Sequence, residues 1–330
     1  MNRLGKNKID LQALLAPAAL VILYVFFCFA SPYFAGLPYL QKILESSYYI
    51  GFMAFGVTFI IITGGIDLSL GTVMMSSALL GAYTFKLGLP LIVSVLLTVG
   101  IAVLFGFVNG LLVAKLKLPP FIATLGTQMM SVGLGSIITK TQSQVWPIAT
   151  AEVGGWFKKV FFKADLFGVK GFPVGTLWLI AFFIIAAVIL HKSKLGRYFY
   201  AIGSNEEAAR LSGVNVNKYK IAAYTLSGFF VGMSALFYAA AYTTITPGQG
   251  AGQEMNGITG VIIGGTSMAG GSGTMVGTLI GVFIMSVLKN GLSACGLQAD
   301  WQTFFTGIVV IGAVLLDIYR TKAASKVKKS

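Results

Sequence analysis

Four polar side chains stand inside apolar stretches of this 330-residue sequence and are the first candidates for chemistry: Asp67, Asn109, Glu254 and Asn290. An ionisable or amide group is costly in hydrocarbon unless it is paired or hydrated, so such residues indicate a translocation pathway as the first functional hypothesis. Acid–base or metal chemistry is not indicated, because the single histidine, His191, ends an apolar run. The sequence therefore predicts no catalytic residue, no metal site and no cofactor.

Asp67 also has a structural interpretation. It lies in ITGGIDLSLGTV, residues 62–73, where a glycine pair and one carboxylate interrupt two apolar runs. We interpret it first as a cap that accepts hydrogen bonds from the amides of Ser69 and Leu70 at the cytoplasmic end of a span. A role in translocation is the alternative.

The asparagines and the glutamate are open to similar alternatives. For Asn109 and Asn290 we favour hydrogen bonds between helices, worth about 0.6 kcal/mol on average in membranes, over contact with a solute. Glu254 lies at the outer end of an expected span. Contact with a solute or a partner and a plain hydrated helix end fit it equally well.

The composition is that of a polytopic membrane protein. Hydrophobic residues make up 56% of the chain, charged residues 10%, and the mean hydropathy is +0.84. Soluble domains carry about 25% charged residues. A net charge of +14 would suggest nucleic acid in a soluble chain, but here the cations sort by side of the membrane. We therefore predict an all-α protein with lipid as a partner and no nucleic acid.

About 20 apolar residues are needed for a helix to cross the ~30 Å hydrocarbon core. The sequence predicts ten such spans, at residues 12–30, 47–64, 68–85, 90–114, 119–138, 173–191, 219–242, 254–270, 273–291 and 300–318. The third and the eighth are short and rich in glycine. Either is a candidate for a broken or re-entrant helix, which is tolerated where protein buries it.

The lysines and arginines predict the orientation, because cytoplasmic loops carry an excess of them. With both termini inside, 16 of the 24 fall on the cytoplasmic side, among them Arg3, Lys6 and Lys8 before the first span. This orientation also makes the loop 192–220 cytoplasmic and the loop 139–172 external.

An internal repeat follows from shifting the chain by 181 residues. Gly51 then aligns with Gly232, and Asn109-Gly110-Leu111 aligns with Asn290-Gly291-Leu292. Spans two to five correspond to spans seven to ten, at approximately 47–138 and 228–319. Because five spans separate the copies, the repeat is inverted, as in many transporters. The whole chain, 1–330, is predicted to be one transmembrane domain.

The most polar long segment between the apolar halves is LGRYFYAIGSNEEAARLSGVNVNKY, residues 195–219. Ser204 and Glu207 have the spacing of a capping box at a helix start, and Gly213 suits a left-handed helix stop. A helix of about two turns is too short to be stable alone in water. It is either an ordinary surface loop or a helix that docks on a partner.

A second glycine-rich tract, residues 261–282, contains no lysine or arginine. A P-loop needs a lysine after its glycines, so this tract does not bind phosphates in that way. Gly273, Gly277 and Gly281 recur every fourth residue, which favours close helix packing. Residues 264–271 are expected to form a flexible join. Because no Walker A motif occurs anywhere in the sequence, the chain is not expected to hydrolyse ATP alone.

The external loop carries aromatic residues and lysines. The spacing of Trp156, Lys159 and Lys163 beside Phe157 and Phe161 predicts an amphipathic helix lying in the outer interface. A docking surface for an external binding protein is the functional alternative, and the two are compatible.

Three of these stretches resemble one family. GRYFYAIGSNEEAARLSGVNV, TGGIDLS and IGGTSMAGGSGTMVGTLIG are similar to the patterns of the membrane permeases of bacterial ABC-type monosaccharide importers, the ribose/xylose/galactoside group. The resemblance covers residues 51–317. It implies a fold like that of the ten-helix permease core of the cobalamin importer, in the bacterial inner membrane. It also implies that an ATPase is contacted by a loop containing Ser204, Asn205, Glu206, Glu207, Ala208, Arg210, Leu211 and Gly213.

The resemblance further implies the partners and the activity. Two permeases pair, as a homodimer or with a paralogue, above a cytoplasmic ABC ATPase subunit, and an extracytoplasmic sugar-binding protein delivers the solute. The chain would then form the pathway for a monosaccharide, ribose-like as a first expectation, and would not itself be an enzyme. The rival hypothesis is an ion-coupled secondary transporter that uses Asp67. Such a carrier has no need of a docking helix in the polar loop.

Overall fold

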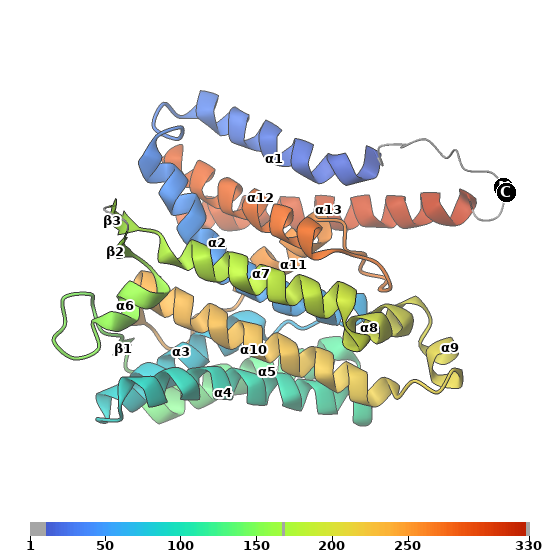
Figure 1. Cartoon of the computed structure of the whole chain (residues 1–330), viewed down its shortest axis with the longest axis horizontal. Helices are drawn as coiled ribbons and strands as arrows, with labels where there is room; N and C mark the ends of the chain where they lie inside the picture. Colours follow the sequence, from blue (N-terminus) through green and yellow to red (C-terminus); the bar gives the residue numbers. More distant parts are fainter. Residues whose placement is uncertain (1–10, 167–168, 328–330) are drawn as a thin grey trace.

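The chain forms a bundle of long helices, most of which run along one common direction (Figure 1). The computed structural model describes residues 11–166 and 169–327. The prediction that Arg3, Lys6 and Lys8 hold the first span lies outside these residues. The helices are α1 (Leu11–Ala30), α2 (Leu37–Ile62), α3 (Leu70–Lys86), α4 (Leu91–Gly110) with the π-helical turn η1 (Leu111–Lys115), α5 (Pro120–Thr139), α6 (Trp156–Phe161), α7 (Val174–Lys192), α8 (Lys194–Ser204), α9 (Glu206–Leu211), α10 (Val216–Tyr242), α11 (Gln253–Ile263), α12 (Met275–Ala294) and α13 (Ala299–Val327).

Each of the ten predicted spans coincides with a helix, but not every helix is long enough to cross a membrane. In the described part of the chain, seven helices have the length and composition for it: α2, α4 with η1, α5, α7, α10, α12 and α13. The apolar stretch of α1, Leu15–Ala30, and the 17-residue α3 are shorter than these seven helices. The count of ten spans stays a prediction.

The eighth predicted span, residues 254–270, is shorter than expected. α11 has only 11 residues and ends at Ile263. Gly265 stops it with a φ of 93°, in the left-handed region that glycine adopts without strain. The amide of Thr266 then bonds back to the carbonyl of Val261. α11 is therefore a partial helix buried by its neighbours, as one of the two alternatives for this segment foresaw.

The centre of the bundle is the pair α2 and α10. In the apolar 18-residue stretch of α2, 94% of the residues are buried inside the protein, compared with 6% in that of α13. Gly56 on α2 lets Ser227 of α10 approach, because a Cβ there would lie 3.0 Å from the Ser227 carbonyl oxygen. α4 packs along α10, and α12 packs along α2. The inverted repeat itself stays a prediction.

The loop 139–172 contains the predicted amphipathic helix, with Trp156 and Lys159 exposed opposite Phe157 and Phe161, while its place in the outer interface stays a prediction. α6 is only six residues long, and its Phe157 and Phe161 are buried against the protein. The rings of Phe157 and Trp146 stack with centroids 4.5 Å apart. Two small antiparallel pairs complete this end: β1 (Gln144–Val145) with β4 (Thr244–Ile245), and β2 (Ala164–Leu166) with β3 (Val169–Phe172). The aromatic residues of this loop therefore pack onto the bundle through the apolar face of α6.

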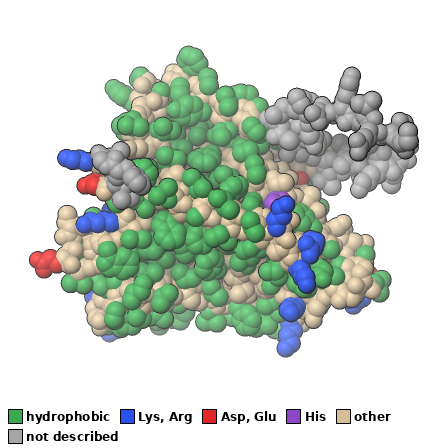
Figure 2. All heavy atoms as spheres, in the orientation of Figure 1, with side chains coloured by type: hydrophobic (Ala, Val, Ile, Leu, Met, Phe, Trp, Pro, Cys, Tyr) green, Lys and Arg blue, Asp and Glu red, His purple; other side chains and the backbone are tan. Residues whose placement is uncertain are grey.

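The surface has a broad apolar zone between two more polar ends. Figure 2 shows hydrophobic side chains covering the middle of the visible face, and lysines and arginines gathered toward the end where α8 and α9 lie. Apolar surface of this extent is expected of a protein whose solvent there is lipid.

Candidate coupling surface and buried polar sites

The polar segment after α7 forms two short helices with a sharp break between them. α8 ends at Ser204, and the extended backbone of Asn205, with φ −160° and ψ 103°, starts α9. The Asn205 side-chain oxygen accepts the amide of Ala208 at 2.9 Å. The capping box of Ser204 and Glu207 was therefore wrong, because Ser204 belongs to the preceding helix and cannot act as the N-cap. The left-handed stop at Gly213 is confirmed by its φ of 83°.

α9 is tied to its surroundings on one side and open on the other. Glu207 pairs with Arg210 at 2.6 Å, and Glu206 pairs with Lys220 of α10 at 2.5 Å. The hydrogen bond to Glu207 raises the pKa of Arg210 above its ordinary value. Ala209 is buried against α8 and α10, whereas Leu211 is 79% exposed. A short, anchored helix with an exposed leucine is suited to docking.

α8 connects this surface to the membrane helices. The Tyr200 hydroxyl donates to the carbonyl of Gly273 at 2.6 Å. At Gly203 a Cβ would overlap the carbonyl oxygen of Ile62, the last residue of α2. The amide of Gly271 donates to the same Ile62 oxygen at 2.9 Å. A displacement of α8 therefore acts directly on α2 and on the connection before α12.

The glycine-rich connection, residues 264–274, is fastened from α13 as well. Asp317 accepts the amide of Met268 at 3.0 Å and the hydroxyl of Ser267 at 3.4 Å. The amide of Ser267 also donates to the carbonyl of Ser272 at 3.2 Å. The close helix packing predicted for Gly273, Gly277 and Gly281 is confirmed at the last two, where a Cβ would overlap a carbonyl oxygen of Gly264 or Gly260. Gly273 precedes α12 and packs in the connection against Thr266 instead.

Asp67 and Asn109, two of the predicted site residues, lie together. One carboxylate oxygen of Asp67 accepts the amide of Ser69 at 2.8 Å and its hydroxyl at 2.6 Å. The other accepts the side-chain amide of Asn109 at 3.1 Å. Thr127 of α5 donates to the Asn109 oxygen at 2.7 Å. Asp67 thus accepts the Ser69 amide, as predicted, but the N-cap of α3 is Ser69 itself, and no bond from the Leu70 amide to Asp67 is found among the described residues.

This network links the 63–69 connection, α4 and α5. Asp67 and Asn109 are 1% and 0% exposed, and the cavity beside them measures only about 10 Å³. That space is roughly enough for one water molecule. The arrangement holds helices together and leaves no room here for a solute, so the structural interpretation of Asn109 fits the geometry best.

Exchanging the two residues tests this interpretation. Asp67→Asn turns an amide toward the Asn109 amide, so we expect it to lower the stability by roughly 0.6 kcal/mol, the average for such bonds in membranes. Asp67→Asn combined with Asn109→Asp restores a donor facing an acceptor. Thermal unfolding of the purified protein in detergent should show the double variant to be more stable than Asp67→Asn alone. A double variant whose loss equals the sum of the two single losses would contradict the pairing.

One alternative for Glu254 was a plain hydrated helix end, and its burial contradicts that alternative. It is 4% exposed in the first turn of α11, and one oxygen accepts the amide of Gly252 at 3.0 Å. The other oxygen has no hydrogen-bond partner among the described residues and faces Gly71 of α3, where an added Cβ would lie 2.5 Å from it. Glu254 is therefore a buried carboxylate packed against α3, with its one hydrogen bond at the start of its own helix among the described residues.

Asn290 lies apart from this network. Its amide donates to the Ser46 hydroxyl of α2 at 2.8 Å, which is the interhelical role that we favoured. It also lines a cavity of about 330 Å³ with Tyr49, Tyr242 and Lys289. Sequence reasoning missed these three, as well as Ser69, Thr127 and Tyr200. Only Ser69 had a signal, its position two residues after Asp67.

Comparison with known proteins places this geometry in context. A family model described as the permease component of the branched-chain amino acid transport system matches residues 39–314. The chain is 35% identical to a ribose import permease protein of Escherichia coli, covering 91% of both chains. It is 38% identical to the ribose import permease protein of Bacillus subtilis, covering 83% of this chain and 82% of the relative. The fructose import permease protein of Rhizobium meliloti is 34% identical, with coverages of 86% and 78%.

A solved structure has a similar fold. It is described as an inward-facing conformation of a metal-chelate type ABC transporter, and it matches with a TM-score of 0.50 at 15% identity, covering 92% of this chain and 99% of the other. At this identity the likeness concerns the fold alone.

Proposed function

The chain belongs to the ABC permease family that contains these ribose and fructose import permeases, and from this we propose that it is the membrane subunit of an ATP-driven importer of a monosaccharide, ribose-like in the first instance. Membership of the family implies a separate ATPase and a binding protein. It also implies that the chain is a non-enzymatic membrane component. The identity of the sugar rests on the names of the relatives.

The observation that carries the proposal is the surface of α8 and α9. α9 is capped by Asn205, anchored through Ala209 and exposed at Leu211. In the proposed assembly the ATPase binds here, on the cytoplasmic side, through Ser204 to Gly213. Both termini lie on that side, and the external binding protein approaches the end formed by α6 and the two strand pairs.

The proposed complex holds two permeases in the bacterial inner membrane. The exposed apolar side chains of α13, such as Phe304 and Ile311, support contact with lipid or with a second copy. The second copy is identical or a paralogue. An inverted repeat with the fold of the cobalamin importer's permease remains part of this proposal, supported by the matching order of long and short helices in the two halves.

The secondary-transporter hypothesis is less well supported. Its coupling residue, Asp67, has both oxygens engaged by neighbours and adjoins a cavity of only about 10 Å³. A carrier that binds and releases ions needs an accessible carboxylate. Asp67 does not have that accessibility here.

Reconstitution tests the proposed function. The purified chain in lipid should hydrolyse no ATP. Combined with a cognate ATPase subunit, it should raise ATP hydrolysis several-fold when the binding protein and sugar are added. Vesicles containing the chain alone that accumulate sugar in response to a proton gradient would establish the secondary transporter instead.

A further inference from the structure

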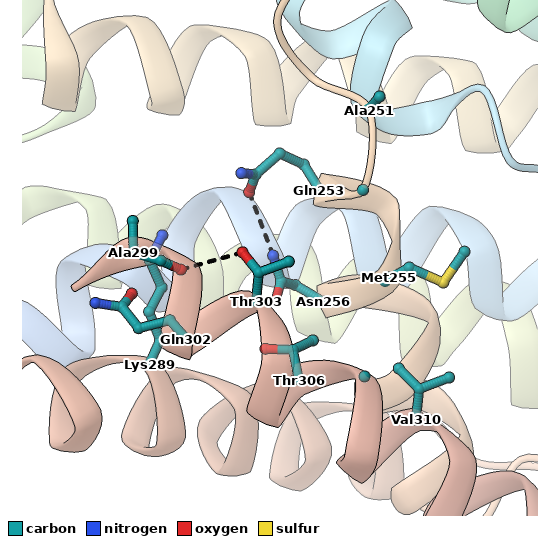
Figure 3. Close-up of a pocket in the computed structure, with 12 residues that line it drawn as sticks. Ala251, Gln253, Met255, Asn256, Lys289, Ala299, Gln302, Thr303, Thr306 and Val310 are labelled. Carbon is teal, nitrogen blue, oxygen red and sulfur yellow. Dashed lines mark hydrogen bonds between the residues drawn. The ribbon is translucent and has the colours of Figure 1, made fainter. Parts of the chain in front are cut away.

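A second cavity, of about 350 Å³, lies between the start of α11, Lys289 of α12 and the first half of α13. Figure 3 shows Gln253 and Asn256 of α11 facing Gln302 and Thr303 of α13 across it. Its volume is within the range of small-molecule sites, roughly 300–1,000 Å³. No function assigned above uses it.

The polar lining follows from the sequence of α13. Gln302, Thr303 and Thr306 recur at helical spacing and line the cavity, whereas Trp301, Phe304 and Ile308 of the same helix are exposed and apolar. Polar side chains in a membrane helix avoid lipid and turn toward protein or water. α13 therefore has a lipid face and a cavity face in this half.

The hydrogen-bond capacity of the lining is largely free. Asn256 donates to Gln253 at 3.2 Å, and Thr303 donates to the carbonyl of Ala299 at 3.1 Å. The Gln302 amide donates to the carbonyl of Leu297 at 3.4 Å, and no other hydrogen bond of the Gln302 side chain is found among the described residues. An amide offers donors and acceptors side by side, and a hydroxyl offers both on one atom. Sugar hydroxyls need this mixture.

Lys289 is the one charged side chain lining this cavity within the described residues, and it is already engaged. Its ammonium donates to the Tyr49 hydroxyl at 2.6 Å and lies 5.3 Å from the Tyr49 ring centre. The tyrosine hydroxyl is neutral, so Lys289 keeps its positive charge, and no carboxylate pairs with it among the described residues. The lining therefore combines one cationic donor with neutral amides and hydroxyls, all of which can bond sugar hydroxyls.

The cavity adjoins the one beside Asn290. Lys289 and Gln302 line both cavities, so these two side chains form the wall between them. The neighbouring cavity adds Tyr49 and Tyr242, whose rings can cover the apolar face of a sugar ring. Together they lie in the half of the bundle remote from α9.

We propose that the cavity between α11 and α13 is a binding site for a polyhydroxylated solute, reached through the cavity beside Asn290. The site holds the solute by Gln253, Asn256, Gln302 and Thr306. This inference rests on the proposed function for its choice of a sugar as the solute.

Two glycines of α13 provide a matched test. At Gly307, which lines the cavity, and at Gly312, which does not, an added Cβ meets no atom within 4 Å. Gly307→Leu therefore fills the cavity without a clash, and Gly312→Leu makes the same change outside it. The assay is uptake of radiolabelled D-ribose and D-fructose by cells that express the ATPase and the binding protein, at equal amounts of permease in the membrane.

We expect Gly307→Leu to reduce uptake at least tenfold and Gly312→Leu to leave it within twofold of wild type. Thr306→Val replaces the hydroxyl with a methyl group of about the same size. It should raise the KM for the sugar several-fold with little effect on the maximal rate. Unchanged uptake in both Gly307→Leu and Thr306→Val, with an active wild type, would overturn the site. If the Gly307→Leu protein is not inserted into the membrane, the KM of Thr306→Val alone tests the site, and an unchanged KM overturns it. A wild type that imports leucine but neither sugar would overturn the proposed function itself.

Discussion

Replacing Leu211 with aspartate is expected to reduce sugar uptake at least tenfold while the amount of permease in the membrane stays unchanged. Leu211 is 79% exposed on α9 and supports no core, so its replacement should not disturb folding. If the ATPase covers it, burial of a leucine side chain contributes about 1.5–3 kcal/mol, and a tenfold loss of affinity needs only about 1.4 kcal/mol. The carboxylate adds the cost of burying an unpaired charge.

The measurement is co-purification of the ATPase with the tagged permease, followed by uptake. Leu87→Asp is the matched control, because Leu87 is also exposed, at 62%, and lies directly after the last residue of α3 and outside α8 and α9. That variant should retain the ATPase. If Leu211→Asp binds the ATPase and transports sugar as the wild type does, α9 is an ordinary surface loop and the coupling role is wrong.

Replacing Gly281 with valine is expected to prevent assembly of the bundle. A Cβ at this position would overlap the carbonyl oxygen of Gly260, so α12 and α11 would have to separate. α11, with 11 residues, is too short to hold its place without that contact. Overpacking costs about 1–3 kcal/mol where side chains can yield, and backbone against backbone yields less.

We expect at least a tenfold fall in folded protein, measured by fluorescence-detected size-exclusion chromatography of a fusion. Gly133→Val on α5 is the control, since a Cβ there meets no atom within 4 Å. It should leave the yield nearly unchanged. Equal yields for the two variants would mean that α11 and α12 tolerate separation.

The helices were largely predictable because apolar length is a strong signal in membrane proteins. The predicted span 219–242 lies within α10, and 119–138 agrees with α5 to within one residue at each end. The extent of α11 was not predictable, since Ile263 and the glycines after it are as apolar as a continuing span. The left-handed conformation of Gly265 and the close contact of Gly264 with Gly277 of α12 show where that helix stops.

The candidate residues show the same division. The cap at Asp67 followed from local spacing, whereas its bond to Asn109 joins residues 42 apart and needed the fold. The capping box failed because its spacing also fits a serine that ends a preceding helix. The cavity beneath α13 had no signal before α11 was placed opposite it.

The partners of α2 have a consequence for how the protein is made. Ser46 and Thr58 of this helix bond to Asn290 and Thr278, and its Tyr49 carbonyl bonds to Ser234. These partners are synthesised 185 to 244 residues after their positions in α2. The hydroxyls of Ser46 and Thr58 also donate to the carbonyls of Ile43 and Ala54 in the same helix, so α2 can enter the bilayer with these groups bonded before its later partners are made.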